Sequence, residues 1–559
     1  MDCASLNPFP EAAAFRRSPS EVMRLERMGC AHPTRLSFLR TLLRRVMDQG
    51  WVFDRPVWDV DQAGVGRAVY RAIGPDRTYS LVAFSHDLPD EMRSDRVIAT
   101  AWDATFTMFD GEPTQDDLDR LQANVPLQEA GRISRKELSL SRANRSVRLF
   151  EHVIDRLAAG QQPDADEVEA VGYLMRTTAV YGSGKFGAAD LTTIAERPEL
   201  NAPFQVEMMS VWLTRQFTVD ITEHLAHVRG GDRAVRLDPV IKRTLGVGNS
   251  TGLGMAPFLV RHPVLLNNWM MAREEALARV RAQSNAQPDR VSGFRKALSD
   301  AQENAAKWTS THPIQVTKLD ALRRDLAQLA DHTRDWPTTN EPHPWDALWR
   351  WAEVELSIEG QEALLSIILE PHGDLIDGLA ECMIADEQAA FRLDGSMTVA
   401  ELMDRLERYY DWALDIDFDQ PENAARFWYV SEEKLEPRLG DRFEEDGAAL
   451  EQPLCIARLA KDLHTELAVQ PGETPIAAFL LAHPEHRLMV RRAQVVQRHP
   501  YAEVRDNLIA AEMLPIDLMR CKLAFFGASR FDPRSDKWVR ISLFQGLPYP
   551  SDLCPEGWA

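Results

Sequence analysis

Apolar residues near the N-terminus recur at the spacing of a helix. Leu36, Leu39, Leu42 and Val46 are three or four residues apart, which places them on one helix face. The segment 141–160 has the same spacing and ends at a glycine, a common helix terminator. The pattern therefore predicts amphipathic helices in both places.

Between these two segments the pattern changes to the alternation that is typical of strands. Residues 68–86 form two runs rich in β-branched and aromatic residues around a Gly-Pro-Asp turn at 74–76, which predicts a hairpin. Residues 96–109 alternate in the same way. We therefore expect a small antiparallel sheet within residues 51–109.

From residue 114 onward the apolar spacing is mostly helical, and only residues 537–546 alternate like a strand. Helical and strand segments do not alternate regularly, which argues against a doubly wound sheet. The fold class we predict is α+β, predominantly α-helical, with a small antiparallel β-sheet near the N-terminus and a short C-terminal strand region.

Polar and proline-rich stretches at 282–293 and 335–346 suggest breaks in the chain,. From them we predict four regions. These are N-terminal helices with the small sheet at 1–113, a central helical region with two glycine-rich loops at 114–285, a polar helical arm with a proline-rich linker at 286–345, and a C-terminal helical region ending in a strand at 346–559.

The chain of 559 residues is 45% hydrophobic and 27% charged, an ordinary globular composition,. Its formal net charge of −21 repels phosphate backbones, so we expect neither a nucleic-acid partner nor an anionic membrane surface. A small anionic molecule is a suitable partner, because the field inside a pocket is local. We expect the protein to associate as a homodimer.

The six cysteines are scattered and form neither a C-x-x-C pair nor a zinc-binding pattern,, which suits a reducing compartment. Residues 1–17 lack the basic and apolar regions of a secretory signal, and no run of about 18 apolar residues predicts a membrane helix,. We therefore expect a soluble, cytoplasmic protein.

The stretch LGVGNSTGLGMAPFL at 245–259 is the strongest candidate for a ligand loop. Glycines let the backbone approach a ligand closely, and short polar side chains lie between them. The dinucleotide pattern would need a glycine in place of Thr251, and no lysine completes a Walker pattern. The alternative is a tight crossing of packed helices. The residues predicted to contact a substrate anion are Gly248, Asn249, Ser250, Thr251 and Gly252.

A second glycine-rich stretch precedes it at 182–187. Lys185 lies among three glycines, and a lysine beside open backbone is a good grip for an anion. We predict that Gly182, Ser183 and Gly184 bind substrate and that Lys185 takes part in catalysis. The alternative is a helix end with Lys185 in solvent. Two such stretches could converge on one pocket.

On a helix, Asp220, His224 and His227 would share one face. An imidazole can move a proton, so His224 and His227 are predicted catalytic residues. Two imidazoles and a carboxylate can also bind a divalent metal. The spacing is not that of the H-E-x-x-H zinc motif, so we predict no metal ligand. The alternative is a pair of histidines that face the helix dipole.

Further charged residues fall in two segments. Arg142, Arg145 and Arg148 step by three along one side of the helix expected there. They could guide an anionic substrate, but a salt-bridge face is the favoured interpretation. Arg534, in a polar and aromatic segment, is predicted to seat a substrate carboxylate, because arginine binds carboxylates with two hydrogen bonds.

Cys30 and His32 are the remaining candidate pair. A thiol and an imidazole can form an activated nucleophile when they meet in space. Cysteine is more often a small buried apolar residue, which is our interpretation of Cys30.

Together these features favour an enzyme of small-molecule metabolism, a lyase, isomerase or hydrolase. It would act by proton transfer on a substrate that bears a carboxylate or a phosphate. No fingerprint of a redox or nucleotide cofactor occurs,, and the cofactor is left open. Two alternatives remain: a non-enzymatic helical binding or assembly protein, and a metal-dependent hydrolase or oxygenase built on Asp220, His224 and His227.

Overall fold

The structure of the 559-residue chain is a computed structural model. The residues that it describes are 10–89, 101–127, 133–177, 197–200, 202–252, 262–337, 341–384, 392–420, 427–428, 438–439, 456–505, 515–532 and 538–558.

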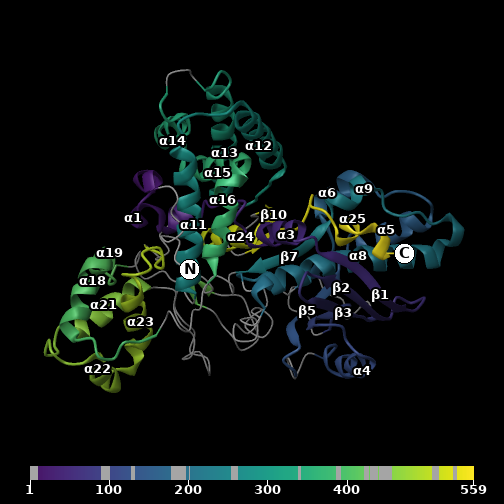
Figure 1. The fold of residues 1–559 in the computed structure, drawn as a ribbon, viewed down its shortest axis with the longest axis horizontal. Coiled ribbons are helices and arrows are strands. Elements are labelled where there is room, and N and C mark those ends of the chain that lie inside the picture. The colour runs from purple at the N-terminus through teal and green to yellow at the C-terminus, as the bar shows by residue number, and fades with distance from the viewer. Residues whose placement is uncertain are drawn as a thin grey trace. The chain divides into compact units, whose positions relative to one another are not determined.

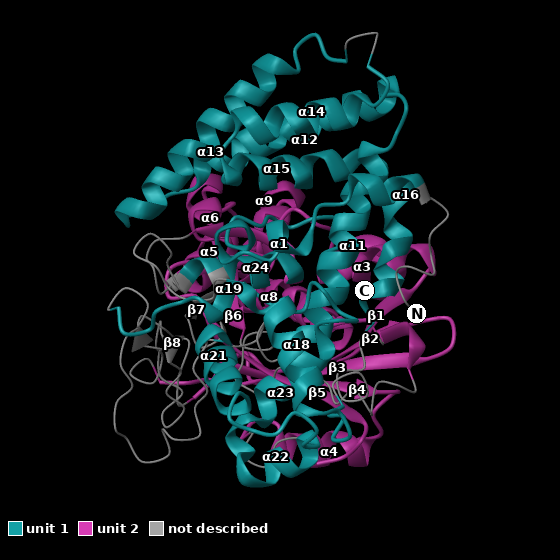
Figure 2. Cartoon of the chain, turned by 90° about the vertical axis from the view of Figure 1, so that its left-hand side faces the viewer, with its two compact units in different colours: residues 1–37, 252–525, 533–538 teal, residues 38–251, 526–532, 539–559 magenta. Residues whose placement is uncertain are grey.

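The chain forms two compact units, each assembled from separate segments (Figure 2). Unit 1 comprises Met1–Ser37, Gly252–Phe525 and Pro533–Trp538, and unit 2 comprises Phe38–Thr251, Phe526–Asp532 and Val539–Ala559. The largest segment of unit 1, Gly252–Phe525, therefore interrupts the sequence of unit 2. The division into four regions stays a prediction.

A nine-stranded mixed sheet is the centre of unit 2 (Figure 1), in the order β1-β2-β3-β4-β5-β6-β7-β11-β10. Neighbours from β1 to β6 are antiparallel, whereas β6 and β7 are parallel. The strands are β1 (Val52–Val60), β2 (Gly66–Ile73), β3 (Thr78–Ser85), β4 (Ala104–Asp110), β5 (Glu137–Arg145), β6 (Tyr173–Thr177), β7 (Gly246–Gly252), β10 (Ala528–Asp532) and β11 (Trp538–Leu543).

This sheet corrects the predicted fold class. The mixture of helices and strands is confirmed, but the small N-terminal antiparallel sheet is wrong, because β1–β4 continue into β5, β6 and β7. The separate C-terminal strand region is also wrong, since β10 and β11 belong to the same sheet. Pairing between strands so distant in sequence leaves no local pattern in a single chain.

Strand β5 explains part of the error. Every residue of Glu137–Arg145 is buried, although Glu137, Ser139 and Ser141 alternate with Leu138 and Leu140 as on a half-buried strand,. The helix predicted at 141–160 overlaps the second half of this strand, where the alternation ends. The helix α5 begins only at Phe150 and ends at Ala158, before Gly160 with its positive φ of 77°.

Helices cover both faces of the sheet. The helix α8 (Gln205–Gly230) packs on one face, where Phe217 contacts Phe106 of β4 and the Ser210 hydroxyl lies 2.9 Å from that of Ser139 in β5. The helix α4 (Gln115–Asn124) packs on the other face, where Leu118 and Leu121 join a core cluster with Phe84, Phe109 and Leu140.

The other helical elements of unit 2 connect and flank the strands. Most residues of α8 are buried, as expected for a helix enclosed on nearly all sides. The remaining elements are α3 (Phe38–Asp48), which confirms the predicted N-terminal helix, α5 (Phe150–Ala158), α6 (Ala165–Val171), η4 (Pro198–Leu200), η5 (Gly231–Arg233), α9 (Pro239–Thr244), α25 (Pro550–Leu553) and η11 (Pro555–Trp558).

Unit 1 is built almost entirely from helices, of which α11 (Pro263–Arg281) is buried along most of its length. Its other elements are η2 (Pro10–Phe15), α1 (Pro19–Val22), α2 (Leu25–Met28), α12 (Pro288–Lys307), α13 (Pro313–His332), α14 (Pro344–Glu355), α15 (Ile358–Leu369), η7 (Glu370–His372), α16 (Gly373–Ile376), η8 (Asp377–Met383), α18 (Val399–Tyr409), α19 (Asp411–Leu414), β8 (Phe427–Trp428), β9 (Arg438–Leu439), α21 (Ile456–Leu467), α22 (Ile476–Ala482), η10 (Pro484–His486), α23 (Arg487–Val495) and α24 (Pro515–Phe526).

Among the helices that the structure describes, none combines the length and the apolar character required to span a bilayer.

Candidate functional site

Polar side chains form a row across one face of the sheet in unit 2. Thr105 of β4 is directly opposite Arg142 of β5, and Asn144 of β5 is directly opposite Arg176 of β6. Side chains on a strand alternate between faces with period two, so opposite pairs share a face. Arg142 and Asn144 are two residues apart on β5, so they join the two pairs into one row. Leu140, two residues before Arg142, lies on the same face of the sheet, which is the face that α4 covers. We call Thr105, Arg142, Asn144 and Arg176 the polar row.

Arg142 is the most unusual member of the polar row. Its side chain comes from the middle of the sheet, and only 8% of the residue is exposed. The guanidinium carbon lies 3.7 Å from the ring centre of Trp102, a cation–π distance. Burial lowers the pKa of Arg142 to about 10, because a low dielectric disfavours the charged form. An anion beside this guanidinium would relieve that cost.

The neighbouring positions bring a second cation and neutral hydrogen-bonding groups. Arg176 is buried, and its Cα is paired with that of Gly248 in the adjacent strand β7. The Asn144 side-chain oxygen accepts a hydrogen bond of 3.1 Å from the Asp103 backbone N–H, which fixes the orientation of the amide. Two guanidiniums, an amide and a hydroxyl on one face form a set of groups suited to a carboxylate or a phosphate.

Gly248 is explained by packing. A Cβ atom at this position would lie 1.9 Å from the ring of Tyr173 in β6, so only glycine fits. Gly246 has the same cause, since its Cβ would lie 2.5 Å from the Leu543 carbonyl oxygen of β11. The stretch predicted as a loop therefore begins as strand β7, and these glycines allow close contact between strands.

The parallel pair β6 and β7 connects the two glycine-rich stretches. Parallel neighbours end at the same edge of a sheet, and ligands of sheets with parallel strands bind beyond the carboxyl ends. The chain after Thr177, the last residue of β6, leads into 182–187, whereas most of 246–254 is strand β7 itself and only residues 253 and 254 follow it. The first stretch thus follows β6 in the sequence, and the second forms the strand beside Arg176.

Strand β10 ends at the same edge. Gly246 at the start of β7 lies against Leu543 at the end of β11, so β11 runs opposite to β7. Since β10 is antiparallel to β11 and Asp532 is paired with Arg540, Asp532 lies toward the carboxyl end of β7. Arg534 follows two residues later and lies outside the described residues.

The other predicted binding residues are described only in part. Gly182, Ser183, Gly184 and Lys185 lie outside the described residues, as does Arg534. Asn249, Ser250, Thr251 and Gly252 belong to β7, and their side chains are not described. Their contact with an anion stays a prediction.

The structure does not bring the predicted catalytic histidines to the polar row. His224 and His227 belong to α8, which covers the opposite face of the sheet. The His224 Nε2 atom lies 2.9 Å from the Asp61 carbonyl oxygen, and its ring packs on Trp58 at a centroid distance of 5.6 Å. His227 is exposed.

Asp220 is engaged by protein groups. Its carboxylate accepts hydrogen bonds from Arg55 at 3.0 Å, Tyr70 at 2.9 Å and Gln216 at 2.8 Å. Burial raises the pKa of Asp220. Within the described ranges no group of three or more histidine, cysteine or acidic side chains is arranged to hold a metal ion.

The three arginines expected on one side of a helix are separated. Arg142 lies in the polar row, whereas Arg145, three residues further along a strand, points to the other face and pairs with Asp103 at 3.7 Å. Arg148 follows the strand and is exposed. A spacing of three is a helical repeat, and on a strand it changes the face.

Cys30 is a buried thiol in unit 1 whose pKa burial raises well above its usual value. His32 stacks on Trp308 at a centroid distance of 5.9 Å, and burial lowers its pKa to about 4. A protonated thiol is a poor nucleophile, so the geometry agrees with the interpretation of Cys30 as a packed residue.

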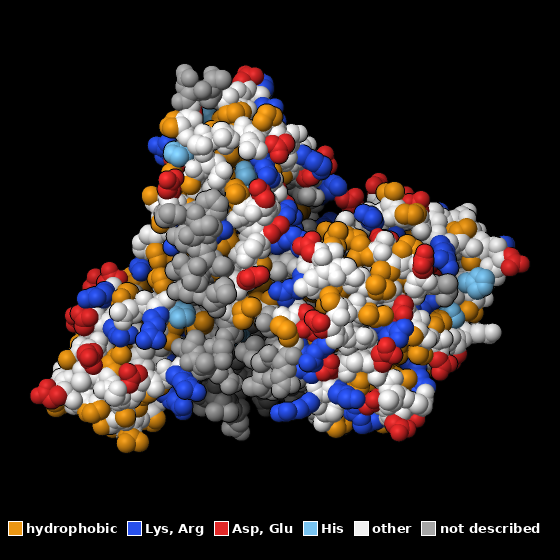
Figure 3. Space-filling model, viewed as in Figure 1, with side chains coloured by type: hydrophobic (Ala, Val, Ile, Leu, Met, Phe, Trp, Pro, Cys, Tyr) orange, Lys and Arg blue, Asp and Glu red, His pale blue; other side chains and the backbone are white. Residues whose placement is uncertain are grey.

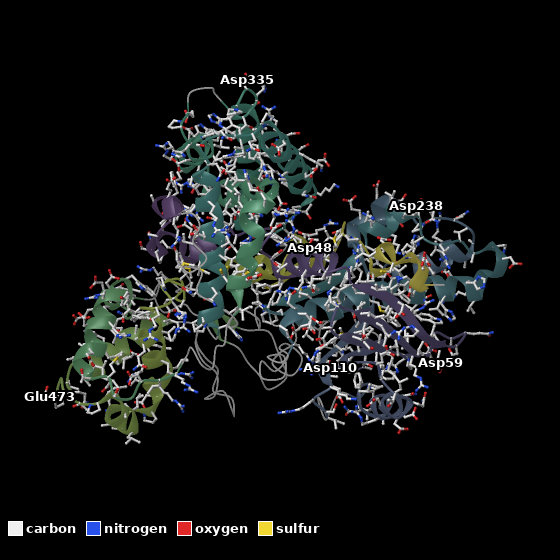
Figure 4. The ribbon with its side chains drawn as sticks, in the orientation of Figure 1. Asp48, Asp59, Asp110, Asp238, Asp335 and Glu473 are labelled. Atoms are coloured by element: carbon white, nitrogen blue, oxygen red, sulfur yellow. The ribbon has the colours of Figure 1, made fainter. Side chains whose placement is uncertain are left out.

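The sequence alone did not indicate Thr105, Asn144 or the neighbouring His86. The His86 Nε2 atom lies 3.4 Å from the Thr105 Oγ1 atom. Asp110, labelled in Figure 4, is the last residue of β4, so Thr105 lies near the opposite end of this strand. The sequence shows alternate polar residues in strand-like segments. Only the strand register shows that these residues, which come from different strands, lie side by side.

No protein-family model matches the chain, and no similar curated protein or solved structure was found.

Proposed function

We propose that the protein is an enzyme of small-molecule metabolism whose substrate carries a carboxylate or a phosphate. The observation that carries this proposal is the polar row, with Arg142 and Arg176 buried on one sheet face. A guanidinium can bind a carboxylate or a phosphate with two parallel hydrogen bonds, so two arginines on one sheet face are suited to hold a substrate anion. The polar row is the candidate anion site.

The position of the row favours a ligand site over a purely structural cluster. Arg176 lies on a strand that is parallel to its neighbour β7, which contains most of one glycine-rich stretch, and the other glycine-rich stretch follows β6 in the sequence. Backbone N–H groups in such stretches can surround an anion. Lys185 and Asn249 would then bind the same anion together with the arginines.

The reaction we propose is proton transfer that leads to elimination, isomerisation or hydrolysis. An arginine-bound carboxylate or phosphate holds the substrate in position, which is a large part of the rate enhancement in such enzymes. The same arginines stabilise negative charge that develops on the substrate as a proton leaves.

We further propose a cytoplasmic protein without a nucleic-acid or membrane partner, which acts as a homodimer. The net charge of −21 supports the exclusion of polyanions,. On the face drawn in Figure 3, basic side chains are interspersed with acidic ones rather than gathered in one large basic region.

Thermal shift with two simple anions tests the proposal. Sulfate represents a tetrahedral dianion and succinate a dicarboxylate, and specific binding raises the melting temperature by mass action. Arg142→Lys keeps the charge but loses the planar fork, and we expect it to weaken anion binding about 10-fold or more.

The matched control is Arg148→Lys, which changes an exposed arginine of the same segment and should leave the shift intact. A wider screen of organic acids and phosphorylated metabolites, with turnover of each hit followed by NMR, then identifies the substrate. The proposal would be overturned if neither sulfate nor succinate binds in a manner that depends on Arg142.

A further inference from the structure

The polar row has an imidazole at one end. The backbone N–H of His86 donates to the Asp103 carbonyl oxygen at 2.8 Å, so His86 extends β3 by one residue beyond Ser85. Because side chains alternate along a strand, His86 shares the face of Phe84, whose side chain belongs to the core cluster under α4. This is also the face of the polar row.

The imidazole of His86 contacts a member of the polar row. His86 Nε2 lies 3.4 Å from the hydroxyl of Thr105, and Thr105 is directly opposite Arg142. Directly opposite residues in an antiparallel pair have Cβ atoms about 4.5–5.5 Å apart. An anion bound to the Arg142 guanidinium would therefore lie within reach of the His86 ring.

The surroundings of His86 favour the neutral ring. His86 is half-buried, and burial lowers its pKa, while the charge of Asp103 acts in the opposite direction. Asp87, the next residue, is exposed, and Arg142 is the cation of the adjacent strand pair. A neutral imidazole beside a substrate site is suited to act as a general base.

We infer that His86 exchanges a proton with the substrate anion bound at the polar row, an inference that rests on the proposed function. The neutral imidazole accepts a proton from a C–H or O–H bond of the substrate and becomes imidazolium. The electron pair of that bond stays on the substrate, where Arg142 and Arg176 stabilise the charge. The imidazolium then returns the proton to the rearranged substrate or its leaving group.

This role differs from the one predicted for His224 and His227. Those histidines belong to α8 on the opposite face of the sheet, and the sheet backbone separates them from Arg142. The ring of His86, in contrast, contacts Thr105, a member of the polar row.

NMR titration of ¹³C-labelled histidine in the full-length protein tests the inference. The His86 signal is assigned by its loss in His86→Gln. Sulfate keeps its charge of −2 across the titration, and succinate is used in its place if sulfate does not bind. A bound anion stabilises imidazolium, so we expect the pKa of His86 to rise by about 0.5–1. The rise should vanish in Arg142→Lys. His332 of unit 1, which stacks on Trp351, should show no rise.

The outcomes separate the inference from the proposed function. If an anion binds in an Arg142-dependent manner and the pKa of His86 does not change, the inference is wrong and the anion site stands. If neither anion binds, both fail. With a substrate from the turnover screen, His86→Gln should lower kcat about 100-fold or more while KM stays within about two-fold. An unchanged kcat would also overturn the role of His86.

Discussion

Arg17 of unit 1 and Arg142 of unit 2 are both buried, but their pKa values are shifted in opposite directions. In unit 1, Arg17 donates two hydrogen bonds of 2.7 Å to Glu274 and one of 2.8 Å to Glu362. Arg273 also pairs with Glu362, and Arg27 lies 3.0 Å from it. These carboxylates raise the pKa of Arg17 against the effect of burial, and the arginines lower the pKa of Glu362. The charges of this cluster compensate one another within the protein.

In unit 2, burial shifts the pKa of Arg142 in the other direction, to about 10, and its guanidinium stacks on the indole of Trp102. A cation stabilised by carboxylates is part of the folded structure, whereas a cation whose charge burial disfavours gains from an added anion. The comparison therefore contrasts arginines that carboxylates of the same unit stabilise with an arginine that we propose binds a ligand.

The largest effect should come from breaking the cluster of unit 1. Glu362→Gln leaves Arg17, Arg27 and Arg273 with one carboxylate fewer in a buried environment. Breaking a buried ion pair from one side typically costs about 3–5 kcal/mol, and we expect this loss in the free energy of unfolding from urea denaturation. Asp300→Asn, which removes an exposed partner of Lys296, is the control and should leave the transition unchanged. An equally small effect of both variants would contradict the comparison.

The same cluster predicts how stability depends on acid. The pKa of Glu362 is lowered in the folded state, so its contribution is fully present above the unfolded value of about 4.3 and is lost as the pH falls toward the folded pKa. Wild-type protein should therefore lose more stability between pH 5 and pH 3 than Glu362→Gln does. The measurement is the melting temperature of both proteins across that pH range. If it falls equally for wild type and Glu362→Gln, Glu362 makes no such contribution.

A buried lysine of unit 1 should behave like Arg142 rather than like Arg17. Burial lowers the pKa of Lys522 from 10.5 to about 7, so the unfolded chain binds more protons between these values and stability rises with pH there. Lys522→Met should raise the free energy of unfolding at pH 7 by a few kcal/mol, roughly, and should gain much less at pH 9.5. A gain that does not change with pH would point to packing instead of charge.

Removing the cation of unit 2 should affect binding more than folding. For Arg142→Met we expect the free energy of unfolding to change by less than about 1.5 kcal/mol, because lost stacking on Trp102 is offset by relief from burying a charge. The melting-temperature shift with sulfate or succinate should disappear. A loss of stability as large as that of Glu362→Gln would place Arg142 with the structural arginines.

The smallest effect is expected at the helix face of α8. His224→Ala removes a contact with the Asp61 carbonyl oxygen and the Trp58 ring, and His227→Ala changes an exposed side chain. Neither variant should alter anion binding or turnover by more than about two-fold, since both residues lie across the sheet from the polar row. A loss of turnover near that of His86→Gln would restore these histidines as catalytic residues.

The sequence predicted the elements with clear periodicity and missed those that tertiary contacts define. The helix α3 and the hairpin of β2 and β3 have strong local patterns, and both are present. Strand β5 alternates only in its first half, Glu137–Ser141, and the helix predicted at 141–160 overlaps its second half. Strand β7 is rich in glycine, and the reason for Gly248 is the ring of Tyr173, a neighbour that only the fold supplies.

The candidate site was predictable in part for the same reason. Arg142 and Arg176 are visible in the sequence as cations near polar segments, but their joint position on one face depends on the register of β5 with β6. The pairing of β3, β4 and β5 brings His86 and Thr105 next to Arg142. A single sequence fixes which residues can bind an anion, and the strand register decides which of them meet.

The segment of unit 1 that interrupts the sequence of unit 2, Gly252–Phe525, has a consequence for synthesis on the ribosome. Strand β7 ends at Gly252, but its neighbour β11 ends only at Leu543. At about 5–20 residues per second, the intervening chain takes tens of seconds to be made. During that time β7, which carries no charged side chain, is an uncovered edge in the nascent protein, and such edges recruit other strands. The last strands to be translated thus end the period in which the growing chain is most open to wrong pairing.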